Sequence, residues 1–368
     1  MRIGVDARKW RDGGIGTYIR NLVACFLAKP EGHRFVVFLL PEDMGSSVRP
    51  GVPAEEVRVT AGKYSIAEHW QMARSAQCAG IELFHAPHYT LPLLLRCPSI
   101  VTVHDLIHVR FAHLSPPGAG LYARAVAGAA VRKARLVLVD STHVRSEVIE
   151  LLGAPEANVR VIPLGVSSSI ARRPSEAVDA FLRARSLPGG YLLYVGARKE
   201  HKNLRLLIEA MGRIPAASRP PLVLSGTPWS GADPLAMAAR SAGVREGIHF
   251  SGEMRGDEDL ALLYSGAALY AQPSLEEGFG LPPLEAMACG TPVLSSSAGA
   301  LPETLGDAAL LLAPLDADAW AHAVVSLLTD GARRAEMSRR GVEWARQFTW
   351  ERTAALTLSV YEEAVGRG

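Results

Sequence analysis

Short apolar runs alternate with longer amphipathic stretches along the first half of the chain. The apolar runs predict buried strands, and the amphipathic stretches predict helices that cover a sheet. Strands are expected at residues 2–6, 35–40, 81–85, 100–104, 136–140 and 159–162, and helices at 17–28, 68–79, 118–133 and 142–152. This alternation is typical of an open parallel sheet with helices on both faces.

The second half repeats the pattern. Strands are expected at residues 191–196, 221–226, 249–251, 269–273, 293–295 and 309–313, and helices at 204–211, 233–242, 257–265 and 317–328. We therefore predict two doubly wound α/β domains, residues 1–168 and 189–348, with a linker at 169–188 and a final helix within 349–368. Such sheets bind ligands beyond the carboxyl ends of their strands.

Composition narrows the class of protein. With 368 residues, 48% of them apolar, the chain has enough apolar side chains for two cores. A net charge of +2 is too small to indicate a nucleic-acid-binding protein. No apolar run approaches the roughly 20 residues that span a bilayer, and the four cysteines lie in apolar surroundings, which predicts buried thiols in a reducing compartment. We expect a cytoplasmic protein, at most peripheral to the inner face of a membrane.

The segment 273–293 is the most informative part of the chain. Glu277 and Glu285 flank a Gly-Phe-Gly turn, and Pro282 and Pro283 mark a helix start, where missing N–H groups are tolerated. A glycine loop before a helix offers backbone N–H groups and the positive end of the helix dipole to an anionic or polar ligand. With a carboxylate on each side, the segment suits a sugar that carries both hydroxyls and phosphate.

This segment resembles the Glu-x7-Glu signature of retaining glycosyltransferases of family 4, which have the GT-B fold. The resemblance continues in register through residues 297–303 and 306–310 and covers nearly the whole chain. It implies an α/β fold of two Rossmann-like domains that face each other across a cleft, with the final helix returning to the N-terminal domain. Variants of the string at 300–303 resemble mannosyltransferases that use GDP-mannose.

The resemblance assigns the nucleotide-sugar donor to the second domain. Lys202 would bind the diphosphate, Glu277 would accept hydrogen bonds from the hexose hydroxyls, and Glu285 would bind the ribose in its ionised form. The family's frequent arginine is Ala197 here, and Arg198 lies one position further on. A solvated basic loop is the alternative for Lys202 and Arg198. The backbone N–H groups expected to serve sugar and phosphate belong to Gly278, Phe279, Gly280 and Leu281.

In the first domain, Gly14 and Gly16 lie in a loop that opens a helix and resembles the family's first glycine loop. Glycines permit close backbone approach to a ligand, so this loop is expected to help bind the donor phosphates or to admit the acceptor, and a plain tight turn is the alternative. His104 ends an apolar strand and resembles the histidine of the family's His-Asp element, which contacts the donor sugar. We expect His104 to shape the sugar pocket and support the transition state.

Three residues near these strand ends are candidates for the acceptor site. Asp105 follows His104, His85 ends the strand predicted at 81–85, and His88 lies just beyond it. Structural histidines buried in the core are the alternative for His85 and His88.

Two acidic motifs are similar to the metal-binding Asp-x-Asp element of the other large glycosyltransferase fold. They lie at residues 257–259 and 316–318, and each opens a predicted helix, where acids satisfy N–H groups and the helix dipole. We therefore expect no metal and no cofactor besides the donor, a GDP or UDP sugar. The resemblance implies a same-face substitution in which the leaving phosphate takes the proton of the acceptor.

The sequence thus predicts a retaining hexosyltransferase that moves a hexose, with mannose favoured, to a glycan or lipid-linked acceptor. The basic segment 118–135 suggests contact with an anionic membrane, or a helix packed on the sheet with basic ends. The alternatives are a catalytically silent nucleotide-sugar binder, a phosphorylase or an epimerase of similar fold. A dehydrogenase is disfavoured because no complete dinucleotide fingerprint follows a strand.

Overall fold

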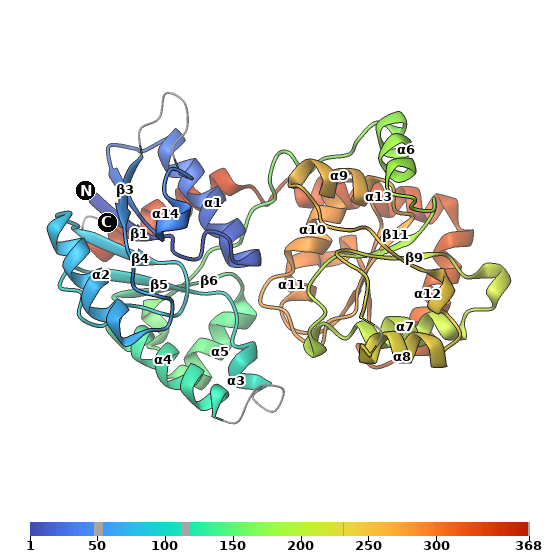
Figure 1. Cartoon of the computed structure of the whole chain (residues 1–368), viewed down its shortest axis with the longest axis horizontal. Coiled ribbons are helices and arrows are strands. Elements are labelled where there is room, and N and C mark those ends of the chain that lie inside the picture. Colours follow the sequence, from blue (N-terminus) through green and yellow to red (C-terminus); the bar gives the residue numbers. More distant parts are fainter. Residues whose placement is uncertain (48–53, 112–117, 231, 367–368) are drawn as a thin grey trace. The chain divides into compact units, whose positions relative to one another are not determined.

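The computed structural model of the protein describes residues 1–47, 54–111, 118–230 and 232–366. The chain divides into two compact units, one formed by Met1–Gly165 with Trp350–Gly368 and the other by Val166–Thr349 (Figure 1). Each unit contains a parallel sheet with helices on both faces. This confirms the predicted α/β fold of two Rossmann-like domains.

The first unit contains a seven-stranded sheet in the order β3-β2-β1-β4-β5-β6-β7. Its strands are β1 (Arg2–Asp6), β2 (Arg34–Leu39), β3 (Glu55–Arg58), β4 (Leu83–Ala86), β5 (Ser99–Val103), β6 (Leu136–Val139) and β7 (Val159–Val161). Its helices are α1 (Gly13–Ala28), α2 (Ile66–Cys78), α3 (Ile107–Arg110), α4 (Ala119–Lys133), α5 (Thr142–Leu152) and α14 (Trp350–Ala364).

Two elements of this unit differ from the sequence prediction. Strand β3 was not predicted, because it is an edge strand with Val57 as its one apolar residue, paired with Phe38 of β2. Helix α1 begins at Gly13, four residues before the predicted start at residue 17. Gly14 and Gly16 therefore lie in the first turn of a helix and not in a loop.

Helix α14 returns to the first unit, as the resemblance implied. It packs on α1, where the Tyr361 and Phe26 rings lie 5.6 Å apart between centroids. Thr353 Oγ1 donates to the carbonyl of Pro163 at 2.8 Å, which fixes the start of α14 beside the end of β7. The last helix of the chain is thus part of the core of the first unit.

The second unit contains a six-stranded sheet in the order β10-β9-β8-β11-β12-β13. Its strands are β8 (Leu192–Tyr194), β9 (Leu222–Leu224), β10 (Ile248–Phe250), β11 (Leu269–Gln272), β12 (Val293–Ser296) and β13 (Leu310–Leu312). Its helices are α6 (Ser175–Ala184), α7 (Leu204–Arg213), α8 (Pro234–Ser241), α9 (Asp257–Ser265), α10 (Leu281–Ala288), α11 (Leu301–Leu305), α12 (Ala317–Thr329) and α13 (Gly331–Ala345).

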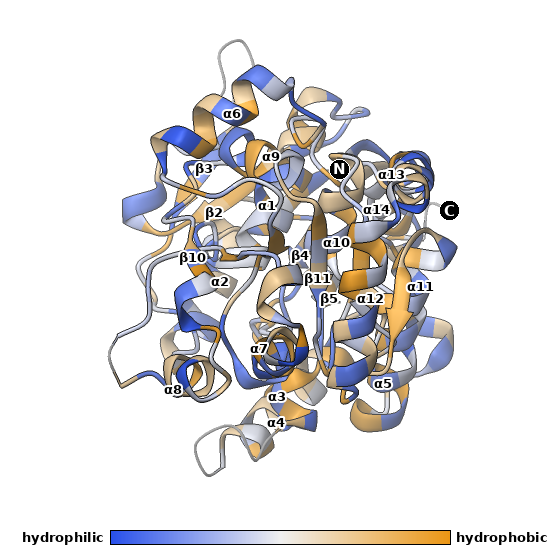
Figure 2. Cartoon of the chain, turned by 90° about the vertical axis from the view of Figure 1, so that its right-hand side faces the viewer, coloured by the Kyte–Doolittle hydropathy of each residue, from blue (hydrophilic) through white to orange (hydrophobic). Residues whose placement is uncertain are grey.

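The segment 169–188, expected as a linker, belongs to the second unit. It contains α6, on which hydrophilic and hydrophobic residues alternate (Figure 2). The apolar side of α6 packs on α9, and Arg185 pairs with Asp259 at 2.6 Å. Helix α13 was not predicted, because most of its residues are polar or small, and it packs on α10 where Gly341 lies against Met287.

Within the described residues, none of the helices combines the length and apolar character needed to cross a membrane. The expected burial of the four cysteines is confirmed only for Cys289. Cys78 is exposed, and Cys25 and Cys97 are partly exposed.

Candidate active site

Lys202 and Glu277 form an ion pair at the carboxyl edge of the sheet in the second unit. Lys202 follows β8 and Glu277 follows β11, which is paired with β8 in the sheet. The Nζ atom of Lys202 lies 2.8 Å from both carboxylate oxygens of Glu277. The two side chains are 20% and 9% exposed, so the pair is largely shielded from water. The fold therefore joins two residues, 75 positions apart, that were expected in one donor site.

Buried side chains near Glu277 form a hydrogen-bond network with its carboxylate. Gln272 Nε2 and Ser274 Oγ each donate to Glu277 Oε1 at 2.7 Å. Tyr270 donates to Gln272 Oε1 at 2.5 Å, which fixes the orientation of the Gln272 amide. Oε1 thus accepts from three side chains and Oε2 from Lys202, so the orientation of the carboxylate is fixed. These hydrogen-bond partners were not predicted from the sequence, although polar residues at the end of a buried strand can indicate side chains that orient a site residue.

Asn203 connects the loop of Lys202 to the rest of the site. Its φ of 55° lies in the left-handed region, which asparagine adopts more readily than most residues. Its side-chain amide donates to the carbonyls of Pro273 and Pro314, at 3.0 and 2.7 Å. The position of Lys202 is therefore fixed relative to the loop that carries Glu277.

The glycine loop after Glu277 is closely packed. Gly280 has a φ of 99° and precedes α10, and a Cβ at this position would lie 2.6 Å from Leu301. The Phe279 ring packs within the unit, 5.9 Å from that of Phe348, so its backbone is the part that remains for a ligand. The N–H groups in the first turn of a helix have no acceptor within the helix. Pro282 and Pro283 have no backbone N–H group, so they cannot donate to a ligand. The loop and Leu281 are thus the places where α10 can donate to an anion.

Gly299, in the segment between β12 and α11, packs against the start of the same loop. Its φ is 59°, and a Cβ there would lie 2.5 Å from Glu276 Oε1 and 2.6 to 2.7 Å from the backbone of Glu277. The N–H of Ala300 donates to the Glu277 carbonyl at 2.9 Å. Gly299 lies in the segment 297–303, which carries part of the family resemblance, but no role was predicted for it from the sequence.

Glu285 lies on α10, half-buried and close to Tyr264. The Tyr264 hydroxyl donates to Glu285 Oε2 at 2.8 Å. Burial raises the pKa of Glu285 to about 7, and the charge of Asp257 acts in the same direction, while the hydrogen bond from Tyr264 opposes them. Near neutral pH, Glu285 is therefore present in both its neutral and its ionised form.

We expect the affinity for a nucleotide sugar to rise between pH 6 and pH 8. In the expected role of Glu285, ribose hydroxyls would donate to its ionised form, and its pKa is about 7. Below that pKa the ionised fraction, and with it the affinity, falls by up to about tenfold per pH unit. Calorimetric titration with a nucleotide sugar tests this, because its diphosphate diester has no titrating proton in this range. Glu285→Gln should bind equally at both pH values, and a flat profile for the wild type would contradict the ribose assignment.

Arg198 lies on the other side of β8 from Glu277. Its guanidinium is 5.9 Å from the centre of the Phe250 ring, at the end of β10. In the strand order, β9 and β10 lie on one side of β8 and β11 on the other. The structure thus places Lys202, and not Arg198, in contact with Glu277.

His104 in the first unit lies between two acceptors. Its Nδ1 is 2.7 Å from Asp140 Oδ2, and its Nε2 is 3.2 Å from the carbonyl of Pro87. Burial alone would lower the pKa of His104, but the charge and hydrogen bond of Asp140, the charge of Asp105 and the Pro87 carbonyl together raise it. Both ring nitrogens face oxygens that only accept, so this environment favours the imidazolium. Asp140 was not singled out from the sequence, because its closeness to His104 depends on the pairing of β5 with β6.

The two glycines of α1 have different surroundings. Gly14 is exposed, a Cβ added there would meet no atom within 4 Å, and the Asp12 side chain does not cap the helix. Gly16 is buried, and its N–H already donates to the Asp12 carbonyl at 2.6 Å. A Cβ at Gly16 would lie 2.5 Å from the carbonyl oxygen of Trp10. The backbone of Gly14 is therefore accessible for the expected contact with the nucleotide sugar. Gly16 is instead required for the packing of α1.

The three acceptor candidates are not equivalent. The prediction for His85 is wrong, because this side chain is fully buried and bridges Tyr361 and Thr102 at 2.6 and 2.7 Å. Burial lowers the pKa of His85 to about 3, so it is neutral. His88 is also buried, with its ring 3.9 Å from that of Tyr89 between centroids, and its Nδ1 has no partner among the described residues.

Asp105, the third acceptor candidate, is half-buried and lies at the start of α3. Its Oδ1 accepts a hydrogen bond from the N–H of Ile107 at 3.1 Å. This contact orders the turn that follows His104.

The acidic motifs considered for metal binding act as helix caps and ion-pair partners. Asp316 Oδ1 accepts from Ala319 N at 2.9 Å and caps α12, as predicted. Asp259 pairs with Arg185, and the other acids of the first motif lie in the first turn of α9.

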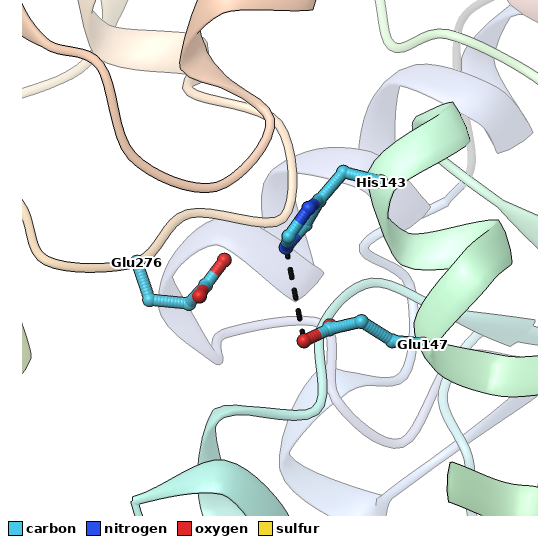
Figure 3. Close-up of side chains that lie close together, drawn as sticks. All are labelled: His143, Glu147 and Glu276. Atoms are coloured by element: carbon cyan, nitrogen blue, oxygen red, sulfur yellow. Dashed lines mark ion pairs between the residues drawn. The ribbon is translucent and has the colours of Figure 1, made fainter. Parts of the chain in front are cut away.

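Another acid-containing group lies on α5 of the first unit. His143 and Glu147 are one helical turn apart, with Nε2 and Oε1 separated by 3.7 Å (Figure 3). Arg110 also donates to Glu147 Oε1, at 2.8 Å. Glu276, drawn in the same figure, belongs to the second unit. Within its own unit, Glu147 is therefore an ion-pair partner of two basic side chains.

Two family models match this chain, one over much of its first half and one over much of its second half. The family model described as "Glycosyl transferases group 1" matches residues 184–344, and that described as "Glycosyltransferase Family 4" matches residues 12–169. Over 285 residues the chain is 35% identical to O-antigen chain mannosyltransferase B of Escherichia coli, a match that covers 76% of this chain and 74% of that protein.

A second relative and a solved structure are more distant. The chain is 32% identical over 285 residues to D-inositol 3-phosphate glycosyltransferase of Stackebrandtia nassauensis, a match that covers 73% of this chain and 64% of that protein. The crystal structure of Anabaena Alr3699/HepE in complex with UDP and glucose is 19% identical, with a TM-score of 0.79 over 99% of this chain and 100% of that one. The latter likeness shows the fold alone. From the family matches, the mannosyltransferase relative and the two parallel sheets, we conclude that the chain belongs to glycosyltransferase family 4 and is a hexosyltransferase with the GT-B fold.

Proposed function

We propose that this hexosyltransferase transfers mannose from GDP-mannose to a glycan or lipid-linked acceptor, with retention of the anomeric configuration and without a metal. Lys202 would bind the diphosphate, Glu277 the hexose and Glu285 the ribose. The N–H groups of Gly14, the 278–280 loop and Leu281 would add donors for the phosphates and the sugar. His104 would face the donor sugar, and Asp105 and His88 remain candidates for the acceptor side.

One observation carries this proposal, namely the ion pair of Lys202 and Glu277 beside the glycine loop before α10. Transfer from a nucleotide sugar builds negative charge on the departing diphosphate and positive charge on the sugar. A cation and a helix N-terminus stabilise the negative charge on the diphosphate, and a carboxylate stabilises the positive charge on the sugar. The name of the 35% identical relative supports mannose as the sugar.

The proposed retaining reaction would use the same groups. The bond between the anomeric carbon and the phosphate oxygen breaks as the acceptor oxygen approaches from the same face, and the leaving phosphate takes the acceptor proton. No side chain is needed as a base. The environment of His104 favours an imidazolium, which supplies a positive charge and does not accept a proton.

We expect one nucleotide sugar in a panel of GDP-mannose, UDP-glucose and UDP-N-acetylglucosamine to break down slowly in the presence of EDTA. An NMR time course would show release of the nucleoside diphosphate and would identify the donor. The anomeric signal of the sugar in the transferred product would report retention or inversion. Turnover that stops in EDTA and returns with Mn²⁺ would contradict the metal-free reaction. Turnover of UDP-glucose in place of GDP-mannose would contradict the assignment of mannose.

A catalytically silent nucleotide-sugar binder is the alternative from another class. Such a binder would be stabilised against thermal unfolding by one donor and would not break it down with any acceptor preparation. The intact pair of Lys202 and Glu277 disfavours this alternative, because plain nucleotide binding does not need a carboxylate at the hexose.

A further inference from the structure

Four of the large apolar side chains that are exposed in the described part of the first unit belong to α2 and to the nearby segment 93–94. Ile66 is 90% exposed, Trp70 61% and Leu94 58%, although burial of such side chains is the rule. Leu93 is 41% exposed beside them. We define the α2 patch as these four residues together with the exposed Arg74 and Arg96.

The α2 patch is continuous across two segments of the chain. Ile66, Trp70 and Arg74 are spaced four residues apart along α2, so they lie on the same face of the helix. The Arg74 guanidinium is 5.6 Å from the centre of the Trp70 ring. The segment of Leu93 is fixed to α2 because its N–H donates to His69 Nδ1 at 3.2 Å. Between α2 and this segment lies an open groove of about 570 Å³, lined among others by Trp70, Arg74, Leu94 and Arg96.

The charge of the α2 patch is entirely positive. None of the residues that line the groove is acidic. Glu68 is the one acid of α2, and it is 2% exposed and pairs with the buried Arg8 at 2.9 Å. Glu82, next to the groove residue Ile81, accepts a hydrogen bond from the backbone N–H of Arg2. Two arginines therefore face outward without a carboxylate among the groove residues.

We propose that the α2 patch docks onto the surface of a bilayer that contains anionic phospholipids. Tryptophan and leucine enter the boundary between headgroups and acyl chains, while arginine keeps its charge at the level of the phosphates. The positive charge of the patch complements an anionic lipid surface. This inference rests on the proposed function, because a lipid-linked acceptor is presented at such a surface. It assigns membrane contact to α2 and residues 93–96, and not to the basic segment 118–135.

Vesicle co-sedimentation of the full chain tests this proposal. We expect the wild type to bind vesicles of phosphatidylglycerol mixed with phosphatidylcholine and not vesicles of phosphatidylcholine alone. Each arginine near an anionic surface contributes about a fivefold factor to the partition coefficient, so Arg74→Glu with Arg96→Glu should lower binding by at least about 25-fold. Trp70→Ser with Leu94→Ser should also abolish binding. Leu315→Ser, at a leucine of the second unit that is 79% exposed, should bind like the wild type.

Three outcomes would overturn the proposal. Both double variants could bind vesicles like the wild type, or Leu121→Ser on α4 could lose binding while they retain it. The wild type could also form dimers in solution that the double variants do not form, which would make the patch an interface between copies. Donor breakdown without vesicles should be unchanged in all variants, since none of these residues contacts the candidate active site. Vesicle binding and donor breakdown are separate readouts, so failure of one proposal is distinguishable from failure of the other.

Discussion

Glu277→Gln is expected to lower the rate of transfer by about two orders of magnitude, as removal of one preorganised electrostatic contact does in other enzymes. The carboxylate accepts from Lys202, Gln272 and Ser274. A glutamine amide keeps one acceptor oxygen but places an NH₂ group where a donor now points. The variant therefore loses the negative charge at the hexose and the alignment of the side chain together.

Steady-state transfer rates and thermal unfolding of the same samples would test this. Lys202→Ala should lower the rate to a similar extent, and the double variant should be far from additive, because the two residues act as one pair. Glu209→Gln, an exposed glutamate on α7 of the same unit, is the matched control. Near-normal turnover of Glu277→Gln in a folded sample would remove Glu277 from its proposed role.

Gly299→Ala is expected to reduce both stability and transfer. The new Cβ would overlap the Glu276 carboxylate and the Glu277 backbone at 2.5 to 2.7 Å, and alanine is strained at a φ of 59°. Left-handed strain and overpacking together should lower the free energy of unfolding by about 2 to 4 kcal/mol. Relief of the overlap moves the loop of Glu277, so the remaining folded enzyme should also be slower.

Denaturant unfolding followed by fluorescence would measure the loss of stability. Gly247→Ala is the control, because this glycine of the same unit has no positive φ and no atom within 4 Å of the new Cβ. If Gly299→Ala were as stable and as active as Gly247→Ala, the close approach to Glu277 would not be a requirement of the site.

Much of the fold could be predicted from periodicity alone. Helices α5 and α9 coincide with the predicted ranges 142–152 and 257–265, because their apolar residues recur at helical spacing and clear boundary residues flank them. β3 and α13 were missed for a common reason: both contain few large apolar side chains. Their places in the fold depend on pairing and packing partners that are distant in the sequence.

The site could be predicted less completely than the fold. The resemblance singled out Lys202, Glu277 and His104, but not the residues that orient them, which are Gln272, Ser274, Asn203 and Asp140. Gln272 and Ser274 lie within five residues of Glu277, and Asn203 follows Lys202 directly. The contacts of Lys202 with Glu277 and of His104 with Asp140 instead depend on which strands are neighbours, and the pairing of β8 with β11 does not follow the order of the chain. Burial overturned the expectation for His85, since the apolar strand before it continues into the core instead of ending at a surface.

The return of α14 to the first unit has a consequence for how the protein is made. All residues of the second unit, Val166–Thr349, lie between two parts of the first. During synthesis the second unit can fold as soon as its last residues leave the ribosome, whereas the first unit lacks Tyr361 and its contacts with Phe26 and His85 until α14 follows. A chain cut at residue 349 would therefore lose part of a core, and not a tail. The second unit is the better candidate for expression as an isolated fragment.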